Sequence, residues 1–301
     1  MRMSTIIIII VLIIIDQITS FRLISPPNTF VPFLHSTSSQ TQTELPNDVA
    51  DSARLAAEAC RNYYVSSPLG IRASVIFDAS KNDETFTRLK SSSEFAQEFV
   101  TSLSTINFGI DGSDNKNNLV RVYFPDEGSS ALAKRDWVVP PNVNFSSLGR
   151  FEIIDTSKDN LAIFYCPKAS EAETVELFLS KLETNENNRH NQAIFVNANL
   201  INMGVTGLGL TSRLLRERLL DDLEEVYCLK QLPWGALTRC WPREFTLWQQ
   251  DETKEDGYRK IKQLGGVHPL DQEVEDTYDI ENGLMEEKKT GLGFLDTIAG
   301  E

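Results

Sequence analysis

The sequence predicts an α/β fold in which helices cover both faces of a mixed, mostly parallel sheet that has an antiparallel, strand-rich C-terminal end. Apolar runs alternate with helical patterns from residue 46 to residue 264, which favours parallel strands joined by helical crossovers. The last three apolar runs follow one another closely, so they should pair antiparallel. Hydrophobic residues make up 41% of the 301 residues and charged residues 24%, the balance of a globular protein, here one α/β domain over 46–264.

The first half of the domain is expected to contain three helices and two strands. Strands are expected where apolar residues run together, and helices where apolar residues recur three and four positions apart behind a capping side chain. Asn47 or Asp48 can cap the first helix, and the serines at 91–93 can cap the second. In order, the elements are a helix over 48–64, a strand over 71–77, a helix over 94–104, a strand over 119–124 and a short helix over 129–136.

The second half leads into the strand-rich end. Thr211 starts the helix with the clearest pattern, in which Leu215, Leu219, Leu223 and Val226 line up on one face. Glycine and proline turns separate the last strands. In order, the elements are strands over 151–154 and 161–165, a helix over 170–182, a strand over 193–196, the helix from Thr211, and strands over 226–232, 236–240 and 245–248.

The amino terminus is expected to carry a targeting sequence in two parts. Arg2 precedes an apolar run over 6–15 that would span about 15 Å as a helix, half of a bilayer core, so residues 1–20 are typical of a secretory signal peptide. Residues 21–45 are rich in serine, threonine and proline with Glu44 as their only acid, which is typical of an organelle transit peptide. An uncleaved signal anchor is the alternative to a cleaved signal peptide.

This combination resembles the two-part presequence of algae with multi-membrane plastids. In such presequences an aromatic residue stands just after the signal cleavage point, where this chain has Phe21. The resemblance implies that the mature chain resides in the plastid stroma and has no transmembrane segment. Secretion is the alternative.

The charge of the chain is negative and concentrated at its C-terminal end. A formal net charge of −14 argues against nucleic acid as the main partner. Residues 265–301 hold ten acidic residues, two lysines and few aromatic residues, so they are expected to form a disordered acidic tail. Such a tail could dock a partner, or it could simply keep the protein in solution.

A glycine-rich loop is the first candidate ligand site. Gly204, Gly207 and Gly209 follow a predicted strand and precede the helix that carries Arg213 and Arg216. Glycines let the backbone approach a ligand, and a helix amino end favours anions, so the loop is a candidate phosphate site. Its spacing matches neither the dinucleotide-binding nor the Walker motif, and tight turns are the alternative explanation.

Two aspartates that end predicted strands form the second candidate. Asp78 and Asp126 should both lie at the carboxyl edge of the parallel sheet, where open α/β proteins bind ligands. Such a pair could hold a metal or act as acid and base, and turn capping is the alternative. Just beyond Asp126, Gly128, Ser129 and Ser130 could present amides to an anion, or Ser129 could cap the following helix.

Histidine and cysteine usage excludes the common catalytic and zinc arrangements. His35, His190 and His268 all lie outside the expected core, so no Ser-His-Asp, Cys-His or zinc set is expected there. Cys166 and Cys228 lie in apolar runs, and the four cysteines show no paired spacing of a disulfide framework. The sequence therefore predicts no catalytic residue, no metal site and no cofactor.

Several segments together resemble a plastid domain-of-unknown-function family of plants and algae. They are IFD, FPDEGSSALAKRDW, VNANL with the following GVTGLG and arginine-rich helix, and VYCLKQLPWGALTRCWPREFTLW. The resemblance covers residues 46–258. One branch of that family is named for low photosystem II accumulation, and a related domain is attached to some plastid adenylate kinases. The resemblance implies residence in the plastid and, for one branch, an auxiliary role in photosystem assembly; it supplies no catalytic residues, and the kinase phosphate loop is missing here.

Two functions are expected on these grounds. The first is a stromal accessory protein without catalytic activity that binds a protein partner, with a thylakoid photosystem subunit as the candidate. Trp234, Trp241 and Trp248 could anchor such a partner, or they could belong to the core. The second is a protein or enzyme that binds a phosphate group or a nucleotide through the loop over 204–209 and Arg213.

Overall fold

A nine-stranded sheet runs through the part of the chain that the structure describes, in the order β3-β2-β4-β5-β1-β6-β7-β8-β9. Neighbouring strands from β3 to β6 are parallel, and those from β6 to β9 are antiparallel. The predicted α/β class and mixed, mostly parallel sheet are therefore confirmed. The strands are β1 (Arg72–Asp78), β2 (Val120–Phe124), β3 (Val143–Ser147), β4 (Leu161–Tyr165), β5 (Gln192–Val196), β6 (Leu223–Leu232), β7 (Gly235–Cys240), β8 (Thr246–Gln250) and β9 (Tyr258–Gln263).

The computed structural model describes residues 45–66, 72–79, 88–106, 119–149, 159–184, 192–200, 210–220, 223–254 and 257–285. All of them belong to one compact unit, Glu44–Glu301. The predicted presequence up to residue 44, the glycine loop and the expected strand over 151–154 lie outside these residues. No helix within the described ranges combines the length and the apolar character that crossing a membrane requires.

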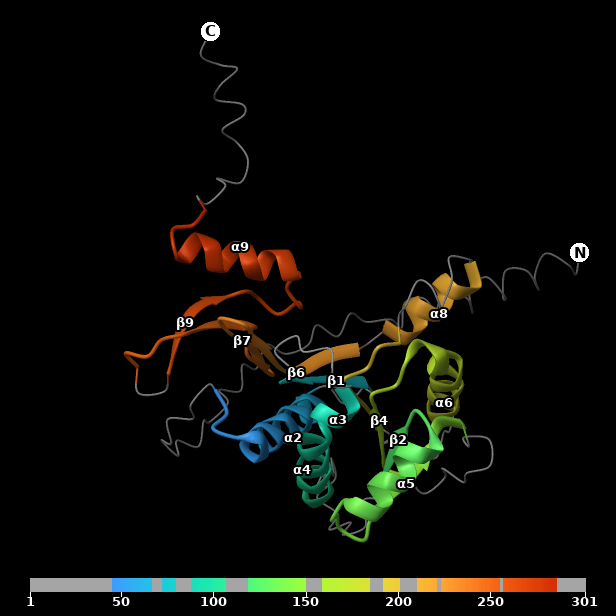
Figure 1. Cartoon of the computed structure of the whole chain (residues 1–301). Helices are drawn as coiled ribbons and strands as arrows, with labels where there is room; N and C mark the ends of the chain where they lie inside the picture. Colours follow the sequence, from blue (N-terminus) through green and yellow to red (C-terminus); the bar gives the residue numbers. More distant parts are fainter. Residues whose placement is uncertain are drawn as a thin grey trace, which may run out of the picture. The chain divides into compact units, whose positions relative to one another are not determined.

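Helices cover both faces of the sheet, as predicted. α2, α4 and α5 pack on one face, and α6, α8 and α9 pack on the other, with α9 over the antiparallel strands (Figure 1). The helices are α2 (Val49–Ser66), α3 (Arg88–Ser91), α4 (Ser93–Thr105), α5 (Glu127–Asp136), α6 (Ala172–Thr184), α8 (Leu210–Leu220) and α9 (Asp271–Glu281), and a short 3-10 helix, η2 (Ala169–Glu171), precedes α6.

The central strands β4 and β5 are buried along their whole length, because helices cover both of their faces. Alternate side chains enter different cores. Ile163 and Ile194 pack on the α2 and α4 side, whereas Phe164 and Phe195 stack on the α6 side with ring centroids 4.8 Å apart. Burial on both faces explains why these strands read as continuous apolar runs in the sequence.

The helix that begins near Thr211 ends earlier than predicted. α8 stops at Leu220, and Leu223 and Val226, expected on the same helical face, belong to β6. Pairing of β6 with β1 overrides the local helical pattern, because it buries Val226 and Tyr227 in the core under α2.

Two edge strands were not predicted from the sequence. β3 and β9 have the sequences VNFSS and YRKIKQ, whose polar and charged residues hide the strand pattern. β9 forms the outer edge of the antiparallel end and carries Arg259, Lys260 and Lys262.

The expectation of a disordered tail from residue 265 onward does not hold for residues 265–285. α9 lies within them and buries Val274 and Thr277, and its Tyr278 stacks on Trp234 with ring centroids 4.0 Å apart. These three side chains recur three and four positions apart, so α9 has an apolar face despite its acidic composition.

Candidate functional site

The carboxyl edge of the parallel strands is the first place where ligand-binding residues were expected. Asp78 ends β1 and Asp126 follows β2, so both lie at this edge, as predicted. In the sheet, however, β4 and β5 lie between β1 and β2. At about 4.8 Å per strand, the two strands are about 14 Å apart. The two aspartates therefore do not form a pair that could share a metal or a proton.

Each aspartate also has a structural contact of its own. Asp126 is the N-cap of α5, where its carboxylate accepts hydrogen bonds from the backbone N–H and the hydroxyl of Ser129, both at 2.8 Å. These bonds, assisted by the charge of Lys168, lower the pKa of Asp126. Asp78 is buried and lies 3.7 Å from the guanidinium of Arg88. For Asp126 the capping explanation is confirmed, and the cap is Asp126 rather than Ser129.

Two non-glycine residues adopt left-handed backbone conformations directly after β4 and β5. They are Cys166, with φ of 51°, and Asn197, with φ of 50°. The side-chain amide of Asn197 donates to the carbonyl of Phe77 and accepts from its N–H, both at 2.8 Å, while the backbone N–H of Asn197 donates to Val75. Asn197 thus continues the ladder between β5 and β1 with its side chain. Strained positions of this kind concentrate at functional sites.

The thiol of Cys166 is unsuited to nucleophilic chemistry at neutral pH. Burial raises the pKa of Cys166 to about 12, although Ser92 and Arg88 favour the thiolate. Since the thiolate is the reactive form, this cysteine is inert at neutral pH.

The second predicted site lies mostly outside the described residues. Of its members, Arg213 is described: its side chain is exposed on the first turn of α8 and forms an ion pair with Glu217 at 2.7 Å. The three glycines and the side chain of Arg216 are not among the described residues. A phosphate site in this loop stays a prediction.

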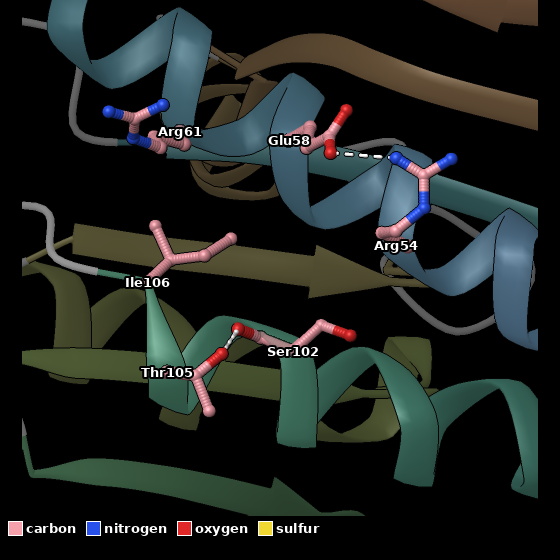
Figure 2. Close-up of a pocket in the computed structure, with 6 residues that line it drawn as sticks. All are labelled: Arg54, Glu58, Arg61, Ser102, Thr105 and Ile106. Atoms are coloured by element: carbon pink, nitrogen blue, oxygen red, sulfur yellow. Dashed lines mark hydrogen bonds and ion pairs between the residues drawn. The ribbon is translucent and has the colours of Figure 1, made fainter.

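A groove of about 380 Å³ opens between α2 and the end of α4 (Figure 2). Arg54, Glu58 and Arg61 line it from α2. The opposite wall consists of Ser102, Thr105 and Ile106. Polar and charged groups therefore dominate the α2 side of the groove.

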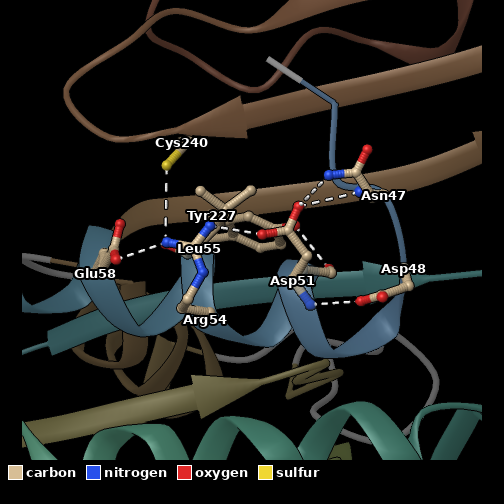
Figure 3. Close-up of polar contacts among 9 residues, drawn as sticks. Asn47, Asp48, Asp51, Arg54, Leu55, Glu58, Tyr227 and Cys240 are labelled. Atoms are coloured by element: carbon tan, nitrogen blue, oxygen red, sulfur yellow. Dashed lines mark hydrogen bonds and ion pairs between the residues drawn. The ribbon is translucent and has the colours of Figure 1, made fainter. Parts of the chain in front are cut away.

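A chain of polar contacts leads from this groove to the start of α2 (Figure 3). Arg54 donates to Glu58 at 2.7 Å and to Asp51 at 2.6 Å, and Asp51 also accepts from the backbone N–H of Asn47. Partial burial pushes the pKa of Asp51 upward, but these hydrogen bonds outweigh it and hold that pKa below its usual range. Asp48 accepts from the backbone N–H of Asp51 and so caps α2, one of the two predicted alternatives.

The three tryptophans of the strand-rich end do not form one patch. Trp241 packs edge-on against Tyr63 of α2, whereas Trp234 stacks on Tyr278 of α9 on the other face. Trp248 donates a hydrogen bond to Thr238 at 2.8 Å. Their observed contacts fit the alternative that they serve packing.

The structure also brings together three residues that the sequence analysis kept apart. Glu225, Cys228 and His268 place a carboxylate oxygen, Sγ and a ring nitrogen within 4.8 Å of one another. No Cys-His set was expected inside the core, and this group lies at its margin, with Cys228 buried and His268 exposed. His268 had been assigned to a disordered tail, and no local sequence signal connects it with β6.

Comparison with known proteins identifies a family but no activity. The family described as Domain of unknown function (DUF1995) matches residues 46–275 of the chain. No curated protein matches the sequence.

Proposed function

The chain belongs to the DUF1995 family, and from that premise we propose that it is an accessory protein of the plastid stroma that binds a protein partner. A photosystem subunit is the candidate partner, and photosystem assembly is the candidate process. The two-part character of residues 1–45 supports the plastid location. The resemblance of residues 46–258 to a family with one branch named for low photosystem II accumulation supports the choice of partner.

The observation that carries this proposal is the state of the polar side chains at the carboxyl edge of the sheet. Asp78 pairs with Arg88, Asp126 caps α5, and Asn197 bonds to the backbone of β1. The two aspartates are separated by two strands, and each of the three polar groups serves the fold. This arrangement favours a protein that acts by surface contact over one that makes and breaks bonds at this edge.

The groove between α2 and α4 is the surface to which we assign the partner. The exposed Arg54 and Arg61 stand two helical turns apart, and Ser102 and Thr105 line the opposite wall, where the hydroxyl of Thr105 donates to the backbone carbonyl of Ser102 at 2.8 Å (Figure 2). Guanidinium groups bind carboxylates through charge-assisted hydrogen bonds. An acidic segment of the partner therefore fits this groove, and Glu58 between the two arginines would limit how many carboxylates it accepts.

The proposal is tested by affinity purification of the tagged chain from plastids, followed by identification of the bound subunits. We expect a photosystem subunit to be recovered with the wild-type chain. Arg54→Glu combined with Arg61→Glu should reduce recovery about tenfold, equivalent to about 1.4 kcal/mol of binding free energy. Arg135→Glu is the matched control, because Arg135 is an exposed helical arginine with an ion-pair partner on α5. Recovery of the bare chain, or equal recovery with the double variant, contradicts the proposal.

A phosphate-binding function is the second candidate, and the exposed guanidinium of Arg213 on the first turn of α8 favours it. The melting temperature of the chain is measured with and without nucleotides and sugar phosphates. A ligand that binds the native state should raise the melting temperature, and Arg213→Ala should weaken that rise. No rise with any of these ligands would leave the partner-binding function as the sole proposal.

A further inference from the structure

The grouping of Glu225, Cys228 and His268 begins with an irregularity in β6. In a regular strand, residues three positions apart point to opposite faces. Between β1 and β6 the register shifts: Ser74 lies opposite Glu225, but Val75 lies opposite Tyr227, so Val226 is an extra residue. Val226 and Tyr227 both pack in the core on the α2 side. The bulge therefore lets Glu225 and Cys228 share the opposite face, where Cys228 packs with the residues under α9.

His268 reaches this face from the segment that joins β9 to α9. Its Nδ1 lies 3.0 Å and 3.1 Å from the two carboxylate oxygens of Glu225, and its ring packs edge-on against Phe245. The segment is fixed on both sides of the histidine. Before it, the backbones of Phe245 and residues 264–265 exchange hydrogen bonds, and after it Asp271 pairs with Lys230 at 2.8 Å. The imidazole is thus held in place rather than carried on a loose chain end.

The three groups have the donor chemistry of a zinc site. Thiolate, imidazole and carboxylate are the three ligand types that bind Zn²⁺ in proteins, at about 2.0–2.3 Å from the ion. In a tetrahedral site such ligand atoms lie roughly 3.3–3.8 Å from one another. The observed atoms already lie within 4.8 Å of one another, so shifts of about 1 Å would complete the geometry.

Burial is graded across the cluster in a way that suits an ion entering from solvent. Cys228 is fully buried, the side chain of Glu225 is 17% exposed and that of His268 is 38% exposed. Nearby cations are already neutralised by other acids, because Arg239 pairs with Glu224 at 2.7 Å and Lys230 pairs with Asp271. The carboxylate of Glu225 therefore remains available to the cysteine and the histidine.

We propose that Glu225, Cys228 and His268 bind one Zn²⁺ ion, with a fourth coordination position left for water. Binding releases the thiol proton of Cys228 to solvent, and the Nδ1 proton of neutral His268 moves to Nε2, so that Nδ1 can coordinate. The ion would then link β6 to the segment before α9. Without an ion, the contact between Glu225 and His268 already links these two parts of the chain. This inference is independent of the partner-binding proposal.

Cobalt substitution tests the site, since Co²⁺ reports its own ligands through absorption. The full chain, freed of metal with a chelator, is titrated with Co²⁺ and then with Zn²⁺. We expect the near-ultraviolet thiolate-to-cobalt charge-transfer band and the visible bands of tetrahedral Co²⁺ to saturate at one ion per chain and to disappear when Zn²⁺ is added. A folded chain without these bands would overturn the proposal.

Variants assign the ligands. Cys228→Ser should abolish the charge-transfer band, and His268→Gln should weaken cobalt binding at least tenfold while leaving the fold intact, because His268 is partly exposed. Cys240→Ser is the matched control: Cys240 belongs to the same sheet but contacts the carbonyl of Leu55 in α2 on the other face. A band that survives in both ligand variants, or that is lost in the control, would show that other residues hold the ion and would overturn the assignment.

Discussion

Replacement of Asn197 tests whether its side chain continues the sheet. Asn197→Ala removes two buried hydrogen bonds of 2.8 Å and leaves the N–H and carbonyl of Phe77 without those partners. At about 1–3 kcal/mol for each of the two buried groups left unsatisfied, the loss is about 2–6 kcal/mol. Alanine also pays about 1–2 kcal/mol for the left-handed backbone at φ of 50°.

Asn197→Gly separates the two contributions. Glycine loses the same hydrogen bonds, but it adopts the left-handed conformation without strain. Glycine also makes the unfolded chain more flexible, which lowers the free energy of unfolding by about 0.4–1 kcal/mol relative to alanine. The glycine variant should therefore be more stable than the alanine variant by roughly 0.5–1 kcal/mol, the reverse of the usual order in a strand.

Urea denaturation followed by far-ultraviolet circular dichroism gives the free energy of unfolding of the three proteins, provided that the m-value is unchanged. Hydrogen exchange of the Phe77 amide should accelerate in both variants. An alanine variant as stable as the wild type would refute the role of the hydrogen bonds. An alanine variant more stable than the glycine variant would refute the free-energy cost that we assign to alanine in the left-handed conformation at this position.

Four further outcomes are expected. Asp159→Asn should lower the free energy of unfolding by about 2–4 kcal/mol in the same denaturation assay, because the partly buried guanidinium of Arg121 loses the charge of Asp159, which is itself buried. Asp136→Asn in the exposed pair with Arg135 should have no measurable effect. Gly235→Ala should lower the melting temperature sharply, because an added Cβ would lie 1.9 Å from the carbonyl oxygen of Trp248, whereas Gly149→Ala meets nothing within 4 Å. In native protein at pH 8 the four cysteines should react with a thiol reagent far more slowly than after unfolding. Cys240 should react first, because burial raises the pKa of Cys240 to about 11 and that of Cys166 to about 12. Equal rates in the native and unfolded states would contradict their burial. The lowered pKa of Asp126 stabilises the folded chain at pH values above 3.8, the ordinary pKa of an aspartate. This stabilisation is lost as the pH falls through the lower pKa of the folded state, so the free energies of unfolding of wild type and Asp126→Asn should converge in acid. A difference that stays constant with pH would contradict the role of Asp126 as a cap.

Local patterns predicted the elements that form the centre of the fold. The continuous apolar runs of β4 and β5 indicated strands because both of their faces are buried. The helix expected over 48–64 is present as α2, whose buried alanines recur three and four positions apart and pack in the core. Patterns failed at the periphery, where β9 carries three basic residues and where α9 places Val274, Thr277 and Tyr278 against the sheet.

The candidate sites depended on information that no local pattern contains. That Asp78 and Asp126 lie at one edge followed from the direction of the strands, but their separation followed from the strand order. The zinc candidate required a bulge at Val226 and a contact of His268 with Glu225, 43 residues earlier in the chain. In a strand without a bulge, Glu225 and Cys228 would point to opposite faces of the sheet, so the sequence alone does not bring them together.

The basic residues of β9 also affect whether the exposed edge of the sheet can pair with another molecule. An outer strand offers unpaired backbone groups as a template on which another chain can assemble, a route to aggregation. β9 presents Arg259, Lys260 and Lys262 along that margin, in a chain whose net charge is otherwise strongly negative. Two molecules that met edge to edge along β9 would bring like charges together, so electrostatic repulsion discourages the sheet from extending from one molecule into the next.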